Sequence, residues 1–199
     1  MKEKKSEGKM FIFTAPSGAG KTTIVRHLLK QYDFLDFSVS ATTREKRAHE
    51  VHGKDYYFLS VSEFDEKVKA GEFIEWEEVY EDRYGTLKSE VDRVWALGKH
   101  IVFDIEVKGA TNIKKLYGDR CKAIFIKPPS LEILIERLTN RKTESASSLR
   151  KRIARVKREM TYQYTFDEVL VNDMLEVAQK EAEFMVETFI FGKPFDEEE

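Results

Sequence analysis

A-P-S-G-A-G-K-T-T, residues 15–23, is the stretch that decides the fold. It follows the apolar run 10–13 and precedes a helix-like pattern that begins at Ile24. A glycine-rich turn between a strand and a helix predicts a phosphate-binding loop, because small residues let backbone N–H groups close around phosphate oxygens. Lys21 is placed to reach the β- and γ-phosphates of a nucleotide, and Thr22 to put its hydroxyl on Mg²⁺. Ala15 stands where the first glycine of this pattern is usual, which is tolerable at negative φ.

Composition limits the class of protein. The chain has 199 residues, of which 41% are hydrophobic and 35% charged, and its net charge is −2. These values predict one α/β domain with a sizeable core, and they argue against a dedicated nucleic-acid binder. The single cysteine, Cys121, lies in the apolar stretch 121–126 and excludes an internal disulfide framework. Neither a signal peptide nor a membrane-spanning run is visible, so we expect a cytoplasmic protein with no membrane partner.

The apolar periodicity predicts alternating strands and helices. We expect strands at residues 9–14, 34–40, 56–59, 73–79, 82–86, 100–106, 121–126 and 168–171. We expect helices at residues 21–32, 62–70 with Ser62 as the cap, 87–97, 110–117, 131–138, from Ser147 or Ser148 to 164, and 173–189. Alternation around a phosphate-binding loop implies an α/β core with a parallel sheet and helices on both faces.

The predicted division of this single domain follows the same pattern. Residues 9–40, 87–136 and 165–190 form the core, and residues 41–86 form a small β-rich insert. Residues 137–150 are polar and lack a helical period in their middle, which predicts a mobile loop. We expect the terminal segments 1–8 and 193–199 to be frayed.

Charged side chains gather around the predicted loop. Arg44 and Arg47 follow the second strand, Arg137 and Arg141 share one helical face, and Arg152 lies on the next helix. A guanidinium group can bind two phosphate oxygens at once. Transfer of a phosphoryl group between two anions needs positive charge of this kind to neutralise them. The basic run 137–158 could also bind nucleic acid, but it lacks interleaved aromatic residues for base stacking.

The order and spacing of several short segments resemble the guanylate kinase family over about residues 11–188. These segments are P-S-G-A-G-K-T at 16–22, S-V-S-A-T-T-R-E-K-R at 38–47, G-K-D-Y-Y-F at 53–58, F-I-E-W at 73–76, Y-G-T at 84–86, D-I-E-V-K-G at 104–109, P-P-S at 128–130, R-L-T-N-R at 137–141 and V-N-D at 171–173. The resemblance implies a P-loop kinase core with a five-stranded parallel sheet, a GMP-binding insert at 41–86 and a mobile lid at 137–150 that closes over ATP. It also implies the reaction of ATP with GMP to give ADP and GDP, with Mg²⁺.

The resemblance also implies roles for individual residues. It implies that ATP is bound by Ala15, Pro16, Ser17, Gly18, Ala19, Gly20, Lys21, Thr22, Thr23, Arg137 and Asn172. It implies that the phosphate of GMP is bound by Arg44, Arg47, Tyr56 and Tyr84, and its base by Ser40, Glu75, Thr86, Asp104 and Glu106. The residues expected to promote catalysis are Lys21, Arg44, Arg137, Arg141 and Arg152, and Thr22 is expected to reach Mg²⁺.

The chemistry of these residue types agrees with a guanine site. One carboxylate, such as Glu75, can accept hydrogen bonds from both N1–H and the 2-amino group of guanine. Adenine would leave that carboxylate buried without partners, which discriminates by about 10⁴ or more. Thr86 stands where serine is common in the family and keeps the hydroxyl, whereas Glu106 stands where aspartate is common and is one methylene longer.

Two other readings remain open at this point. A kinase with the same frame could phosphorylate another acceptor, such as ribose 1,5-bisphosphate, although such an acceptor would not need Glu75, Ser40 and Thr86. The family also includes scaffold modules that bind peptides, and these typically lose the phosphate-binding loop. Gly18, Gly20 and Lys21 are present here, which favours an enzyme.

Overall fold

The computed structural model of the chain describes residues 8–79, 81–139 and 146–192. The strands are β1 (Met10–Thr14), β2 (Leu35–Phe37), β3 (Ala41–Thr42), β4 (Tyr57–Phe58), β5 (Phe73–Val79), β6 (Asp82–Leu87), β7 (His100–Asp104), β8 (Cys121–Lys127) and β9 (Glu168–Val171). The α-helices are α1 (Lys21–Gln31), α2 (Val61–Lys69), α3 (Lys88–Ala96), α4 (Val107–Tyr117), α5 (Leu131–Thr139), α6 (Ala146–Met160) and α7 (Leu175–Phe191). Two 3₁₀ turns follow α4 and α6, at Gly118–Arg120 and Thr161–Thr165.

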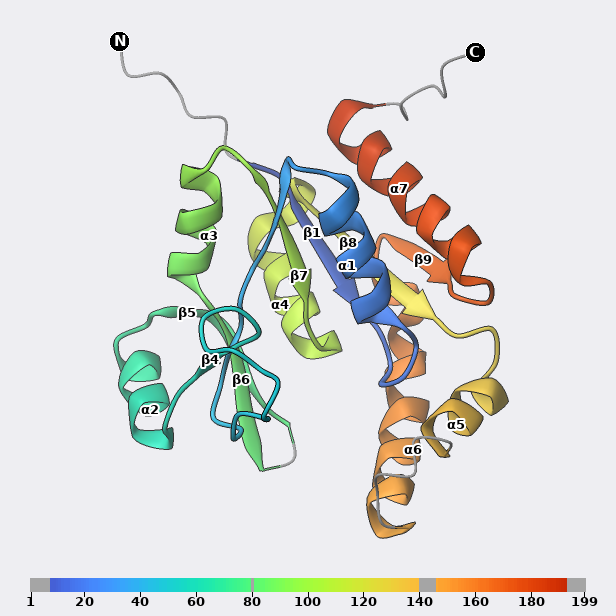
Figure 1. Cartoon of the computed structure of the whole chain (residues 1–199), viewed down its shortest axis with the longest axis horizontal. Coiled ribbons are helices and arrows are strands. Elements are labelled where there is room, and N and C mark those ends of the chain that lie inside the picture. Colours follow the sequence, from blue (N-terminus) through green and yellow to red (C-terminus); the bar gives the residue numbers. More distant parts are fainter. Residues whose placement is uncertain (1–7, 80, 140–145, 193–199) are drawn as a thin grey trace.

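The core is a five-stranded sheet in the order β2-β7-β1-β8-β9, with every neighbouring pair parallel. This confirms the predicted fold class. Strand β1 is buried on both faces, as a central parallel strand should be. Phe11 and Phe13 face the layer of α1 and α7, while Met10 and Ile12 face the layer of α3 and α4. Helices therefore cover both faces of the sheet (Figure 1).

A second sheet, in the order β4-β3-β6-β5, lies within residues 41–87, which we call the insert. The ring of Phe64 on α2 stacks on Phe73 of β5 at 4.5 Å and gives the insert a small core of its own. The expectation that Ser62 caps α2 was wrong. Ser60 is the cap, because its hydroxyl accepts from the backbone N–H of Glu63 and the Glu63 carboxylate accepts from the Ser60 N–H.

Several predicted boundaries shift where the chain bends toward one end of the sheet. The strand expected at 34–40 covers Leu35–Phe37, and residues 38–40 leave the core sheet for the insert. The strand expected to reach Glu106 ends at Asp104. The helix expected from Ala110 begins at Val107, with Glu106 as its N-cap. The chain therefore turns from strand to helix immediately after Asp104.

The predicted lid falls partly outside the described residues, since 140–145 are not described. The flanking helix α6 begins at Ala146 and ends at Met160, so the expected start at Ser147 or Ser148 was one or two residues late. The expected helical end at 164 was also wrong, because a 3₁₀ turn covers Thr161–Thr165. The final helix is Leu175–Phe191 where 173–189 was expected. Of the segments predicted to be frayed, 1–8 and 193–199, all but Gly8 lie outside the described residues, and Gly8 is buried.

The insert and the α5–α6 pair extend from the same end of the core, on opposite sides of it (Figure 1). The phosphate-binding loop follows β1 and leads into α1, whose buried side chains Ile24, Val25 and Leu28 pack into the core. Within the described ranges, no helix combines the length and the apolar character that a membrane crossing needs.

Candidate active site

A cleft of about 860 Å³ opens at this end of the core. Three parts of the chain line it. They are the phosphate-binding loop with the turn after β7, the strands and loops of the insert, and one face of α6. In an open α/β sheet, ligands bind beyond the carboxyl ends of the strands, which is where this cleft lies.

The phosphate-binding loop takes the conformation that its glycines permit. Gly18 and Gly20 have φ of 92° and 93°, which residues with a Cβ rarely adopt. A Cβ on Gly20 would also lie 2.3 Å from Nδ2 of Asn172. That buried amide donates to the Ala19 carbonyl at 2.7 Å, so Asn172 supports the loop from behind. Ala15 is 2% exposed and packs in the core, so alanine is accommodated there.

The Asp104 carboxylate contacts two polar side chains of the loop. Its Oδ1 lies 2.6 Å from Nζ of Lys21, and its Oδ2 accepts from the Thr22 hydroxyl at 2.9 Å. Nζ of Lys21 also donates to the Ile105 carbonyl at 3.0 Å. Burial alone would lower the pKa of Lys21, but the charges of Asp104 and Glu106 outweigh it, so the pKa lies above its ordinary value. Lys21 is therefore held as a cation.

The arginines of the insert are organised by a buried carboxylate. Glu50 is 7% exposed, and its Oε1 accepts from Nη2 of Arg44 at 2.7 Å. Its Oε2 accepts from the backbone N–H of Arg47 at 2.8 Å. The hydrogen bond from Arg44 holds the pKa of Glu50 below its usual range. The Arg44 guanidinium also lies over the ring of Tyr56, 5.5 Å from its centroid.

Two tyrosines next to Arg44 also line the cleft. The rings of Tyr56 and Tyr84 meet edge to face, with centroids 6.0 Å apart. Burial raises the pKa of Tyr56, and the nearby Asp104 raises it further. The Tyr56 hydroxyl therefore stays protonated and available as a donor at neutral pH.

The buried carboxylate of Glu75 lies deeper in the insert. Oε1 accepts from the Thr86 hydroxyl at 2.7 Å, and the side chain is 9% exposed on average. A Cβ on Gly109 would come within 2.6 Å of Oε2, so only glycine at the start of α4 lets the carboxylate lie against that helix. Burial raises the pKa of Glu75 to about 7. Among the described residues, none of the contacts given for the Glu75 carboxylate comes from a cation. The carboxylate is therefore suited to accept hydrogen bonds from neutral N–H donors.

Helix α6 contributes two arginines, one turn apart. Nη2 of Arg152 donates to the Ser17 hydroxyl of the phosphate-binding loop at 2.9 Å. Nη2 of Arg155 donates to Oε2 of Glu106 at 2.9 Å, and its Nε donates to Oε1 of Glu159 at 2.5 Å. One helix thus contacts both the loop and the acidic turn after β7.

Most residues predicted for the site line this one cleft. They are Ala15, Pro16, Ser17, Gly18, Ala19, Gly20, Lys21, Thr22, Thr23, Ser40, Arg44, Arg47, Tyr56, Glu75, Tyr84, Asp104, Glu106 and Arg152. Thr86 and Asn172 are buried behind the lining and hold residues that form it. Arg141 lies outside the described residues, as does the side chain of Arg137.

Sequence reasoning missed several residues of the lining. They are Glu77, Val79, Asp82, Gly85, Ile105, Gly109, Lys151 and Arg155. Two of them left a signal. Arg155 is three residues from Arg152 and therefore shares its helical face, and Gly109 ends the segment D-I-E-V-K-G. The register of β5 against β6, which the sequence does not reveal, places Glu77, Val79, Asp82 and Gly85. Ile105 lies in the turn after β7, and Lys151 lies on α6 beside Arg152.

Comparisons with known proteins agree with this geometry. The family model described as guanylate kinase matches residues 7–189. The chain is 47% identical to the guanylate kinase of Bacteroides thetaiotaomicron, over 94% of this chain and 92% of that protein. It is 45% identical to the guanylate kinase of Chlorobium chlorochromatii, over 92% of this chain and 96% of that one.

A solved structure gives the same result. The crystal structure of guanylate kinase from Anaplasma phagocytophilum superposes with a TM-score of 0.71 at 26% identity, covering 91% of this chain and 85% of that one. The family model, the curated relatives and the solved structure name one family across nearly the whole chain. The chain belongs to the guanylate kinase family.

Proposed function

We propose that the cleft transfers the γ-phosphoryl group of ATP to a phosphate oxygen of GMP, which gives ADP and GDP. This ATP-dependent phosphorylation is the activity of the guanylate kinase family. One observation supports it above the others. A single cleft holds a phosphate-binding loop, an Arg–Tyr surface suited to a second phosphate, and a buried carboxylate suited to guanine.

The donor site comprises residues 15–23. Backbone N–H groups of the loop and the N-terminus of α1 face the phosphates of ATP. Lys21 adds a fixed positive charge near the β- and γ-phosphates. We assign Asn172 a supporting role, because its amide holds the Ala19 carbonyl and leaves the loop free to face the ligand.

Mg²⁺ is the implied metal, and the residues present fit it. Thr22 offers a hydroxyl and Asp104 a carboxylate, and hard oxygen donors of this kind suit Mg²⁺ bound together with nucleotide phosphates. When bound, the ion neutralises negative charge on the phosphates. We therefore place Asp104 at the donor site, beside Lys21 and Thr22. The family resemblance instead implied that Asp104 contacts the base of GMP.

The acceptor phosphate is bound by Arg44, Arg47, Tyr56 and Tyr84. Glu50 fixes the Arg44 guanidinium and the backbone of Arg47, so the Arg44 cation is positioned before the substrate arrives. The tyrosine hydroxyls donate to phosphate oxygens without adding charge. The ionised phosphate of GMP is itself the nucleophile, so the site does not need a general base.

Guanine is read by Glu75, with Ser40, Thr86 and Glu106 around it. Glu75 accepts from N1–H and the 2-amino group, and Ser40 supplies a hydroxyl near O6. The Thr86 hydroxyl already donates to Glu75 in the structure, which orients the carboxylate. Arg155 holds Glu106 and so offsets its extra methylene.

Charge neutralisation supplies the catalysis. Lys21, Arg44 and Arg152 lie around the place where the two phosphates meet. We propose that residues 137–150 act as a lid that adds Arg137 and Arg141. An arginine at a transferring phosphoryl group is worth about 10³ to 10⁵ in rate in known kinases and GTPases.

Titration of GMP into Glu75→Gln tests the assignment. We expect binding to weaken by at least about 10²-fold, because an amide NH₂ would face the guanine donors. Glu78→Gln is the matched control, since Glu78 is an exposed neighbour on the same strand. Equal GMP affinity of the two variants would remove Glu75 from the base site.

A further inference from the structure

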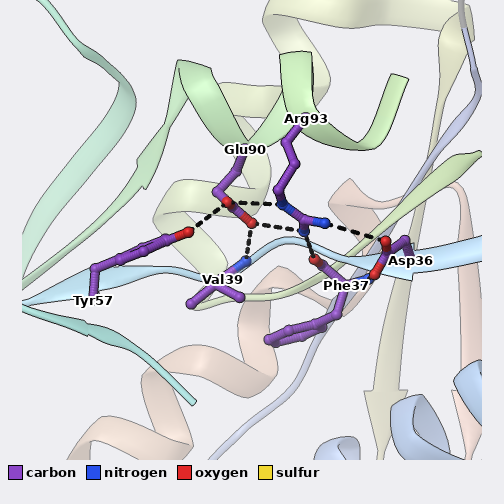
Figure 2. A network of polar contacts seen from close by, with 6 residues as sticks. All are labelled: Asp36, Phe37, Val39, Tyr57, Glu90 and Arg93. Atoms are coloured by element: carbon purple, nitrogen blue, oxygen red, sulfur yellow. Dashed lines mark hydrogen bonds and ion pairs between the residues drawn. The ribbon is translucent and has the colours of Figure 1, made fainter. Parts of the chain in front are cut away.

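Glu90 of α3 forms a buried polar network that the proposed chemistry does not use. Its side chain is 2% exposed and accepts hydrogen bonds from three elements, as Figure 2 shows. Oε2 accepts from the backbone N–H of Val39 at 2.9 Å, and Oε1 from the Tyr57 hydroxyl at 2.9 Å. Arg93 donates through Nε at 3.0 Å and Nη2 at 2.9 Å. Both oxygens are thus fully engaged.

Arg93 extends this network along the chain. Its Nη2 also donates to the Phe37 carbonyl at 2.7 Å, and its Nη1 lies 3.2 Å from Oδ2 of Asp36 (Figure 2). Glu90 and Arg93 together therefore hold the segment 36–39 as it leaves β2. A guanidinium fork paired with a carboxylate fixes geometry as well as charge.

The network lies where the core joins the insert. The chain enters the insert through residues 38–40 and leaves it between Leu87 and Lys88, at the start of α3. Val39 belongs to the first connection, Glu90 follows the second, and Tyr57 belongs to strand β4 of the insert. Two connections and one strand of the insert are tied to a single carboxylate.

Residues of the acceptor site follow directly from these contacts. Ser40 is the next residue after Val39, lines the cleft, and accepts from the Tyr57 backbone N–H through its carbonyl at 2.9 Å. Tyr56, which also lines the cleft, precedes Tyr57. A shift at Glu90 would therefore displace both the base-side serine and the phosphate-side tyrosine.

We propose that Glu90, paired with Arg93, is a positioning residue for the acceptor nucleotide, because it sets the placement of Ser40 and Tyr56 relative to the core. The proposal rests on the proposed function for the identity of that nucleotide. Neither Glu90 nor Arg93 lines the cleft, so the effect is transmitted through backbone and through Tyr57. Removing Arg93 would leave the buried charge of Glu90 without its cation.

Steady-state kinetics of Glu90→Gln and Tyr57→Phe test this role. We expect Glu90→Gln to raise KM for GMP by about tenfold while KM for ATP stays within about twofold, since the donor loop has no contact with the network. Tyr57→Phe removes one hydroxyl and should shift KM for GMP in the same direction by a smaller factor. It also serves if Glu90→Gln does not fold.

Glu183→Gln is the matched control. Glu183 is 8% exposed and pairs with His27 and Lys180 on the face of α1 and α7, away from the cleft. We expect it to lower Tm and leave KM for GMP unchanged. KM for GMP within twofold of wild type in both Glu90→Gln and Tyr57→Phe would overturn the proposal. Failure of the wild-type chain to turn over GMP would instead overturn the proposed function.

Discussion

Oδ1 of Asp104 lies 2.6 Å from Nζ of Lys21, although the two residues come from different strand–helix turns of the core. Parallel strands β1 and β7 are neighbours, and their carboxyl ends bring the two turns together. The same carboxylate accepts from the Thr22 hydroxyl through its second oxygen. Asp104 thus lies where we propose that Mg²⁺ binds, beside Lys21 and Thr22 of the phosphate-binding loop.

Asp104→Asn should weaken the apparent affinity for Mg²⁺ by about 10- to 100-fold, because the amide supplies a neutral ligand and frees Lys21. We expect kcat to fall and the binding of GMP without ATP to persist. Turnover measured as a function of free Mg²⁺ checks this, with the exposed Asp92→Asn as control. An unchanged Mg²⁺ dependence would place Asp104 outside the donor site.

Lys21→Ala should reduce kcat by at least about 10²- to 10³-fold, since a cation near the transferring phosphoryl is lost. Titration of GMP alone should give nearly wild-type affinity, because Lys21 belongs to the donor loop and not to the acceptor site. Single-turnover kinetics with saturating substrates measure the chemical step. Near-normal turnover would contradict the role assigned to Lys21.

Glu75 predicts a pH effect on catalysis. Burial raises its pKa to about 7, and the protonated carboxyl can accept fewer hydrogen bonds from guanine. The value of kcat/KM for GMP reports the free enzyme, so it should fall as pH drops through about 7. The phosphate of GMP contributes equally to the pH profiles of wild type and Glu75→Gln. The difference between the two profiles therefore reports the titration of Glu75. Parallel pH profiles would argue against titration of Glu75.

The same residue predicts an effect on stability. The folded state raises the pKa of Glu75, so its contribution to stability is present below the unfolded pKa and is lost as pH rises through about 7. Glu75→Gln should therefore stabilise the nucleotide-free protein at pH 8, on the order of 2–3 kcal/mol. Chemical denaturation at pH 5 and pH 8 measures the difference. A variant that is less stable than wild type at pH 8 would contradict this.

Arg155 and Glu106 should behave as a coupled pair. Arg155→Met frees the Glu106 carboxylate and should raise KM for GMP more than KM for ATP. Glu106→Gln should have a similar effect, and the double variant should cost less than the sum, with coupling of about 1 kcal/mol. A double-mutant cycle on kcat/KM provides the measurement. Additive effects would show that the 2.9 Å contact does not serve the acceptor site.

The fold could be predicted because its signals are local. The apolar strand at β1, the glycines of the loop and the periodicity of α1 each specify one element. Boundaries were less accessible. Ser60 and Ser62 each have an acidic residue three positions later, Glu63 and Asp65, so this spacing alone does not choose between them. In the structure the Glu63 carboxylate accepts from the Ser60 N–H and makes Ser60 the cap. Strand β2 ends at Phe37, just before the point where the backbone N–H of Val39 donates to Glu90 of α3.

Residues of the candidate site could be predicted only where the residue type and the order of the segments indicate a role. Lys21 and Thr22 follow from the loop itself, whereas Glu75 needed the resemblance, because a glutamate in an alternating strand is usually solvent-facing. The supporting contacts of Asn172 and Arg155 join residues 153 and 49 positions apart. Such contacts arise from tertiary packing, which a single sequence does not report.

The most direct measurement is ADP release from ATP and Mg²⁺ with a panel of acceptors: GMP, AMP, UMP, CMP and ribose 1,5-bisphosphate. The account predicts turnover with GMP and a kcat/KM for AMP that is lower by about 10⁴-fold or more. Turnover with ribose 1,5-bisphosphate in place of GMP would contradict the assignment of the base site. GMP binding without turnover would contradict the enzymatic function itself.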